Sequence, residues 1–387
     1  MLRKADRPDF PDGDAAVRLF DAFAGCGALS AGFLLAGIET GVELGARLAI
    51  EQEEIPAKTY ARNIGDVVEQ DPIEALLDGA LGEAITPAER KLQKKVGEVQ
   101  LGLAGPPCQG HSDLNNHTRR ADPRNALYAK VARAAAVLAP NVLCVENVPA
   151  VRNDQGGVLE TTKTELERLG YRVDDAFIDM HLIGVPQRRR RHILLACEPG
   201  HGDPTELLKQ LVEHPCSEHL PRDVRWAIED IKDLKSDAMH DSASHPSDEN
   251  RGRIDFLFDN RRYNLPNPLR PKCHRDFEHS YNSMYGRLRW DKPAQTITSG
   301  YGSMGQGRYV HPGRRRTLTP HEAARLQTVP DWFDFAEATT RSALARMIGN
   351  AVPPLLGLDI GRLVLPLLRS RDLGRNGLAD TQLRAAA

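Results

Sequence analysis

Short apolar runs alternate with helix-like patterns through the first 200 residues of the chain. The apolar runs have the length of buried strands and cover residues 17–23, 46–52, 99–105, 142–148, 171–179 and 191–198. Between them, apolar residues recur with helical spacing over residues 29–37, 56–63, 125–140 and 157–170. This alternation predicts an α/β fold with a doubly wound, mostly parallel, Rossmann-like sheet.

The pattern weakens after about residue 200. Residues 236–285 are rich in Ser, Asp, Asn, Pro, His and Arg and show little periodicity, which favours a smaller, irregular domain or a set of long loops. Regular spacing returns at residues 318–330, where Thr319, Pro320 and Glu322 form the signature of a capped helix start. A last helical region covers residues 342–368, and residues 371–387 are predicted to be a frayed tail.

Composition narrows the class of protein. The chain has 387 residues, of which 41% are hydrophobic and 27% charged, as in soluble globular proteins. It has no run of 18 apolar residues and no apolar segment typical of a secretion signal at its start, so we expect no membrane span. Its six cysteines form no CxxC pair, which argues against a disulfide framework or a zinc site and for a reducing cytoplasm.

Charge is unevenly distributed along the chain. The formal net charge is −2, but residues 251–316 hold 14 Lys and Arg against 5 Asp and Glu. A locally basic segment on an otherwise acidic protein is compatible with a face that binds nucleic-acid phosphates, and equally with an ordinary solvated surface. Charge alone leaves both interpretations open.

A glycine-rich turn, DAFAGCGALSAG, follows the first predicted strand and precedes a helix. Ser30 stands where a dinucleotide-binding fingerprint needs its third glycine, and the turn has no lysine to make a phosphate loop. A cofactor without phosphates fits better, and S-adenosylmethionine is the obvious candidate. Glu51 ends the second strand, where an acid commonly binds ribose hydroxyls, and Asp71 (or Asp66) lies where it could accept from an adenine amino group.

The sequence AGPPCQGHS carries Cys108 directly after the strand at 99–105, at the edge of the sheet where ligands bind in such folds. An isolated cysteine is usually inert and buried, but this one lies in a polar loop stiffened by two prolines. Glu146 ends the next strand, VLCVENV, and should reach the same edge. A carboxylate buried there is costly unless it has a partner or a function.

Four arginines precede the strand at 191–198. Because side chains alternate along an extended chain, Arg189 and Arg191 should share one face. Arg188 and Arg190 should share the other face, so that one pair could enter the site while the other meets phosphate or solvent.

Taken together and in this order, FAGCG, GPPCQGHS, ENV, QRRRR, RTLTPHEAARLQTVPDWF and GNAVPP resemble the motifs of the bacterial-type C5-cytosine DNA methyltransferases over nearly the whole chain. The resemblance implies that Cys108 attacks C6 of a cytosine and that Glu146 protonates or hydrogen-bonds N3. It also implies that Arg189 and Arg191 bind O2 of the base and hold Glu146. The target base must leave the duplex stack to be reached.

The same resemblance implies a cofactor and a substrate. The residues expected around S-adenosylmethionine are Phe23, Gly25, Gly27, Glu51, Asp71, Pro107 and Asn350. The residues expected to contact double-stranded DNA are Gln109, Ser112, Arg188 and Arg190. The implied domains are catalytic (15–199), target-recognition (200–290) and a return to the catalytic domain (291–370). We expect a cytoplasmic, nucleoid-associated bacterial protein that acts as a monomer on DNA, with or without a separately acting restriction endonuclease.

Two departures and three rival interpretations accompany the resemblance. Ala28 replaces a frequent second glycine, and His111 replaces a residue that is usually apolar. The rivals are an RNA (tRNA) cytosine methyltransferase, a DNA-binding regulator that has lost catalysis, and a nicotinamide oxidoreductase. The basic segment disfavours the RNA methyltransferase, and Ser30 disfavours the oxidoreductase. The inactive regulator is disfavoured by the presence of all four residues of the reaction, Cys108, Glu146, Arg189 and Arg191.

Overall fold

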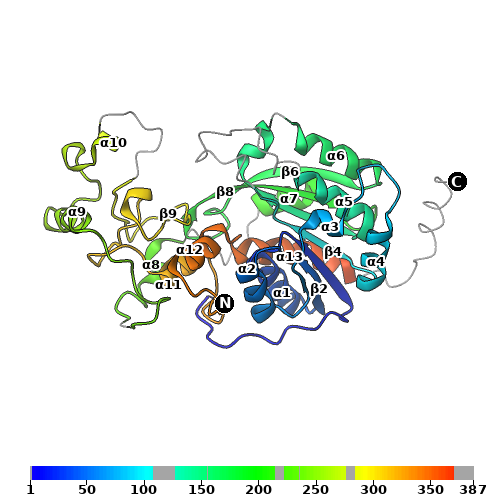
Figure 1. The fold of residues 1–387 in the computed structure, drawn as a ribbon, viewed down its shortest axis with the longest axis horizontal. Helices are drawn as coiled ribbons and strands as arrows, with labels where there is room; N and C mark the ends of the chain where they lie inside the picture. Colours follow the sequence, from blue (N-terminus) through cyan, green and yellow to red (C-terminus); the bar gives the residue numbers. More distant parts are fainter. Residues whose placement is uncertain are drawn as a thin grey trace.

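A seven-stranded sheet organises the larger half of the protein in a computed structural model, which describes residues 2–107, 127–154, 156–213, 222–234, 236–275 and 284–369 (Figure 1). The strand order is β3-β2-β1-β4-β5-β8-β6, and β8 is antiparallel to both of its neighbours. The strands are β1 (Val17–Ala22), β2 (Leu44–Ile50), β3 (Val68–Glu69), β4 (Leu101–Ala104), β5 (Val142–Asn147), β6 (Arg172–Asp179) and β8 (Arg190–Cys197). The predicted α/β, mostly parallel sheet is confirmed.

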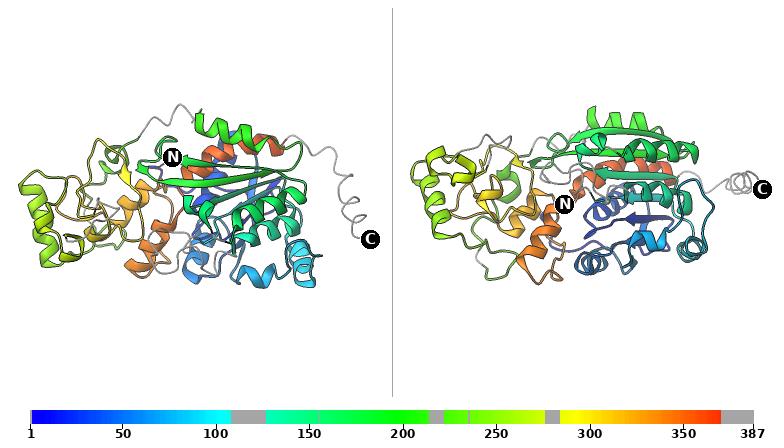
Figure 2. Two further views of the ribbon diagram at one scale, coloured as in Figure 1. Left: turned by 90° about the horizontal axis from the view of Figure 1, so that it is seen from above. Right: turned by 45° about the horizontal axis from the view of Figure 1, so that its top comes forward.

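Helices cover both faces of this sheet (Figure 2). One face packs against α1 (Ala28–Thr40), α2 (Glu54–Asn63), α7 (Pro204–Glu213) and α13 (Pro354–Arg369). The other face packs against α3 (Ile73–Leu76), α4 (Pro87–Val96), α5 (Ala129–Leu138) and α6 (Val158–Arg168). The buried apolar side chains of the sheet therefore divide between two apolar clusters, as the strand alternation requires.

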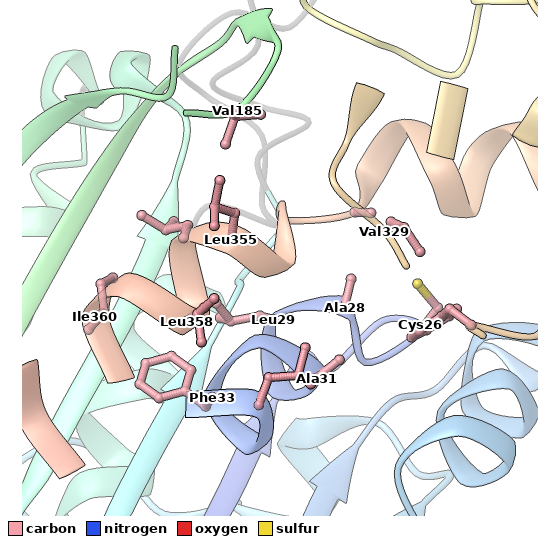
Figure 3. Close-up of a cluster of buried hydrophobic side chains, with 14 of the residues drawn as sticks. Cys26, Ala28, Leu29, Ala31, Phe33, Val185, Val329, Leu355, Leu358 and Ile360 are labelled. Carbon is pink, nitrogen blue, oxygen red and sulfur yellow. The ribbon is translucent and has the colours of Figure 1, made fainter. Parts of the chain in front are cut away.

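The closest helix contact joins α1 to α13, which comes from the far end of the chain (Figure 3). A Cβ on Gly32 would stand 2.1 Å from the carbonyl oxygen of Pro354, and one on Gly357 would stand 2.6 Å from that of Leu29. Side chains at these positions would push the helices apart, so glycine permits the backbones to touch. The contact closes the core and brings the last helices back to the first turn.

One helical stretch, Arg341–Arg369, is long and apolar enough to cross a membrane. It comprises α12 (Arg341–Asn350) and α13, and 72% of its most apolar window is buried inside the protein. This burial matches a core helix.

The smaller half has little regular structure and its own apolar cluster. Its elements are α8 (Val224–Ile228), α9 (Asp248–Asp259), η3 (Asn267–Leu269), α10 (Lys272–Arg275), β9 (Ala294–Gln295) and η4 (Met304–Gln306). Ile254 and Leu257 of α9 pack with Leu265, Met304 and Val310. These residues are far apart in sequence, which explains why periodicity gave only a weak signal. Helices α9 and α10 lie at the end of the molecule away from the sheet (Figure 1).

A two-stranded sheet joins the two halves. In it, β7 (Gln187–Arg188), which precedes β8, pairs in parallel with β9 of the smaller half. Helix α11 (Pro320–Leu326) begins with the predicted capping box, in which Thr319 Oγ1 accepts from the N–H of Glu322. Helix α7 packs on β6 and β8 and therefore lies with the sheet, while the predicted domain boundary near residue 200 stays a prediction.

Candidate active site

The carboxyl ends of the parallel strands meet at one edge of the sheet. Register places Ala22, the last residue of β1, beside Ile50 of β2 and Ala104 of β4. The segments that follow these three residues therefore leave the sheet side by side. The antiparallel β8 begins at this edge, because Asn147 at the end of β5 pairs with His192.

The turn after β1 is built on positive φ angles, which are 59° at Phe23, 54° at Gly25 and 88° at Gly27. A Cβ on Gly27 would lie 2.8 Å from the ring of Tyr60, so this position needs glycine. The N–H of Gly25 donates to Glu51 Oε2 at 2.9 Å and fastens the turn to the end of β2. Among the described residues nothing lies within 4 Å of where a Cβ of Gly25 would stand. The turn thus offers bare backbone to a ligand.

A buried carboxyl group lies close to this turn, at the end of β1, and the sequence analysis did not identify it. Asp21 is 2% exposed, its Oδ2 accepts from Ser30 Oγ at 2.6 Å, and Ser30 Oγ accepts from the hydroxyl of Tyr60 at 3.1 Å. Burial raises the pKa of Asp21 to about 7, the Ser30 hydrogen bond opposes this, and nearby Glu51 adds to it. The only sequence signal is an acid inside the apolar run 17–23.

Replacing Asp21 with asparagine is expected to stabilise the protein above neutral pH. Because the folded state holds this proton more tightly than the unfolded state, Asp21 costs stability as pH rises from about 4 to about 7. The Asp21→Asn variant lacks that cost, which is up to roughly 4 kcal/mol. Its melting temperature relative to wild type should therefore rise between pH 5 and pH 8. A difference independent of pH, or an equal one in the exposed Asp14→Asn control, contradicts the assignment.

Other residues predicted to bind the cofactor follow strands that end at the same edge of the sheet. Glu51 is half-buried, and its Oε1 accepts from the N–H of Glu53 at 2.8 Å. Burial raises the pKa of Glu51, against the effect of its backbone hydrogen bonds. Arg346 Nη1 lies 3.4 Å from Glu53 Oε2, so α12, which ends at Asn350, contacts the segment that follows Glu51. Asp71 follows β3 and is exposed. These residues fit a small molecule with hydroxyl and amino groups and no phosphate.

Glu146 and Arg191 form a largely buried charged pair at this edge. Glu146 is 8% exposed, and its Oε1 lies 2.7 Å from Nε of Arg191. The pair is close but not aligned for a hydrogen bond, so Oε1 accepts none from any described residue. A buried carboxylate oxygen that lacks a hydrogen bond suits a ligand that supplies one.

The other three arginines lie elsewhere. Arg189 is 4% exposed, and its guanidinium donates to the backbone carbonyls of residues 297, 349 and 351. These contacts place its guanidinium in the joint between the two halves. The expectation that Arg189 also binds the base and holds Glu146 stays a prediction. Arg188 and Arg190 are exposed, and Arg190 stacks over the ring of Phe177.

Cys108, Gln109 and Ser112 lie outside the described residues. The structure describes the segment that leads to Cys108. This segment follows β4 and ends at Pro107, which is partly buried. The carbonyl of Pro106 accepts from Asn147 Nδ2 at 3.4 Å. The backbone just before Cys108 is therefore held against the residue that follows Glu146.

A histidine cluster outside this edge has ligand atoms within 4.8 Å of one another, from His240, Asp241 and His321. Both ring nitrogens of His321 are engaged, Nδ1 with Asp241 at 2.8 Å and Nε2 with Asp331 at 3.0 Å. The two imidazoles stack with an interplanar angle of 19°, so their in-plane lone pairs do not converge on one ion. This cluster ties the loop at 240 to α11 and is not a metal site.

Comparison with known proteins identifies the family of this chain. A model of the C-5 cytosine-specific DNA methylases matches residues 17–364. The chain belongs to this family. It is 41% identical to Type II methyltransferase M1.BsuMI of Bacillus subtilis, over 92% of this chain and 82% of that protein. It is 30% identical to Type II methylase M.HgiDII of Herpetosiphon aurantiacus, over 89% and 94% of the two chains.

Solved structures agree on the fold. The S. pombe Dnmt2 methyltransferase superposes with a TM-score of 0.62 at 16% identity, over 92% of this chain and 99% of that one. The C-5 cytosine-specific DNA methylase is thus an α/β enzyme whose family implies S-adenosylmethionine as cofactor and DNA as substrate.

Proposed function

We propose that this methylase transfers a methyl group from S-adenosylmethionine to C5 of a cytosine flipped out of double-stranded DNA, through a transient bond between Cys108 and C6. The observation that carries the proposal is Glu146 Oε1, which is buried, paired with Arg191 and without a hydrogen bond among the described residues. The exocyclic amino group of a cytosine could supply that bond, and N3 could accept one from Glu146 when its carboxyl group is protonated.

The chemistry explains why these residue types occur together. The thiolate of Cys108 would bond to C6, because a thiol is too weak a nucleophile, and Glu146 would give a proton to N3 so that negative charge does not build up on the ring. When bound, S-adenosylmethionine supplies the methyl group. Arg191 would hold Glu146 in place and bind O2 of the base. A base from solvent would then take the C5 proton, the electron pair left behind would form the C5=C6 bond, and the thiolate would leave C6. N3 would give its proton back to Glu146.

The cofactor would lie on the turn after β1. Gly25 and Gly27 would let it approach the backbone, Phe23 and Pro107 would line it, and Asn350 would close it. Glu51 would bind the ribose hydroxyls and Asp71 the adenine amino group. Support comes from the open space at Gly25 and from the contact of α12 with Glu53.

The target would be duplex DNA. C6 is inaccessible inside a stack, so the base must be flipped at a cost of a few kcal/mol. The smaller half would read the sequence, with Arg188, Arg190, Gln109 and Ser112 on the DNA near the target base. Relatives that are named Type II methyltransferase and Type II methylase support a bacterial protein of a restriction-modification system. The proposal further includes a cytoplasmic, nucleoid-associated protein that works as a monomer, with or without a separately acting endonuclease.

A 5-fluorocytosine duplex tests the proposal. Bisulfite sequencing of DNA from cells that express the protein first gives the methylated site. A duplex with 5-fluorocytosine at that site should remain covalently attached, because fluorine cannot leave C5 as the proton does, and peptide mass spectrometry should place the adduct on Cys108. An adduct on another residue, or preferential methylation of tRNA over this duplex, contradicts the proposal.

A further inference from the structure

Three buried side chains occupy the joint between the two halves of the protein. Gln187 and Gln327 are 0% exposed and Arg189 is 4% exposed. We name these three residues the joint cluster. Gln187 Nε2 donates to Gln327 Oε1 at 2.6 Å, which links β7 to the end of α11. Neither glutamine received a role from the sequence, although both lie inside the motifs QRRRR and RLQTVP.

On one side the joint cluster holds the segment that returns from the smaller half. Gln187 Oε1 accepts from the N–H of Ile297 at 3.0 Å, and Arg189 Nη1 donates to the carbonyl oxygen of Ile297 at 3.0 Å. Both backbone groups of one residue are thus fixed by buried side chains. Thr296 and Thr298, its neighbours, are partly exposed.

On the other side the joint cluster holds the backbone around Asn350. Gln327 Nε2 donates to the carbonyl of Ile348 at 2.8 Å, and Arg189 Nη2 donates to that of Ala351 at 3.3 Å. The two segments also touch directly, because a Cβ on Gly349 would stand 2.2 Å from the backbone nitrogen of Ser299. Asn350 itself is exposed at the end of α12, so its direction depends on how its neighbours are held.

The apolar surroundings leave this arrangement little freedom. Val185 and Val329, each two residues from a glutamine of the joint cluster, belong with Leu355 to the apolar core over the start of α1 (Figure 3). A buried side-chain amide that loses its hydrogen-bond partner has no water to bond in its place. Movement of the backbone at Ile297 therefore requires movement of the backbone at residues 348–351 as well.

We infer that Gln327 and Gln187 are positioning residues that couple the binding of DNA by the smaller half to the binding of cofactor at Asn350. This inference rests on the proposed function. A duplex that fixes the segment at Ile297 favours the joint geometry in which Asn350 faces the cofactor, and the cofactor favours the same geometry in return. Coupling between two sites is reciprocal, so each ligand raises the affinity for the other by one factor.

The test measures that factor by calorimetry. The affinity for S-adenosylhomocysteine is measured with and without a saturating duplex that carries the methylation site. In the wild type we expect the duplex to tighten binding by about fivefold or more. Gln327→Met keeps the side-chain length and removes every hydrogen bond of the amide, so the factor should fall below about twofold. Gln187→Met, which leaves Gln327 on residues 348–351, should lower the factor while cofactor affinity without DNA stays unchanged.

Gln93→Met is the matched control. Gln93 Nε2 donates to the carbonyl of Val137 at 2.6 Å on the face of the sheet away from the joint cluster. This variant also loses a glutamine-to-backbone bond and should keep the wild-type factor. An unchanged factor in both joint variants, or an equal loss in the control, overturns the inference.

The wild-type protein allows a test that needs no variant. S-adenosylhomocysteine alone should slow hydrogen exchange at the amide of Ile297, which is bonded to Gln187. Exchange that does not respond contradicts the coupling. Failure of the wild type to bind cofactor or methylate DNA would instead refute the proposed function.

Discussion

Methyl transfer is expected to disappear when Cys108 is replaced with alanine. Without the sulfur no bond to C6 can form, and C5 of cytosine is too poor a nucleophile to take a methyl group by itself. The loss should be on the order of 10⁴-fold or more, as for the removal of a covalent nucleophile in other enzymes. Cofactor affinity should change little, because the predicted cradle lies on the turn after β1. Incorporation of radioactive methyl groups into duplex DNA measures the first quantity, and calorimetry measures the second.

Cys197→Ala provides the control for the loss of a thiol. Cys197 is buried at the opposite end of β8 from Arg191, and burial raises the pKa of its thiol to about 12, so it is not a thiolate. Its variant should keep activity within about threefold. Turnover close to wild type in Cys108→Ala would refute the covalent mechanism.

Glu146→Gln should produce the second-largest effect. The amide has the shape of the carboxyl group but cannot give N3 a proton, so kcat should fall by about 10²–10⁴-fold. The exchange also leaves the buried Arg191 without its countercharge. DNA and cofactor should still bind, because the remaining contacts are untouched.

Glu165→Gln is the matched control, since Glu165 of α6 pairs with Arg168 of its own helix, away from the strand ends. It should leave kcat unchanged. If Glu146→Gln kept the wild-type kcat, or changed KM alone, Glu146 would have no part in the chemical step.

The sequence predicted most elements of the sheet because their signals are local. An apolar run such as VLCVENV needs no distant residue to be identified as a buried strand, and its observed bounds are Val142–Asn147. The start of α11 was equally clear, because Thr319, Pro320 and Glu322 act on one another within a single turn. Helix α9 gave little signal, since its apolar face is completed by Leu265, Met304 and Val310 from later in the chain.

The candidate site divides in the same way. That Glu146 ends one strand and Arg191 begins another follows from the chain, and the motif order indicates their chemistry. Their contact at 2.7 Å depends on β8 lying antiparallel beside β5, which no local pattern specifies. Arg189 shows the limit, because alternation predicted that it shares a face with Arg191 but could not predict its bonds to the backbone carbonyls of Ile297 and Ala351.

By itself the sequence determined the α/β class, the family and the residue types of the reaction, because strand length, glycine turns and motif order are carried by neighbouring residues. Only the tertiary structure decided which buried polar groups meet. The joint cluster of Gln187, Arg189 and Gln327 bonds to residues that lie up to 162 positions away. Asp21, near the turn after β1, accepts a hydrogen bond from Ser30 of α1. A buried polar group must find a partner wherever the fold brings one, and that partner is set by packing rather than by sequence distance.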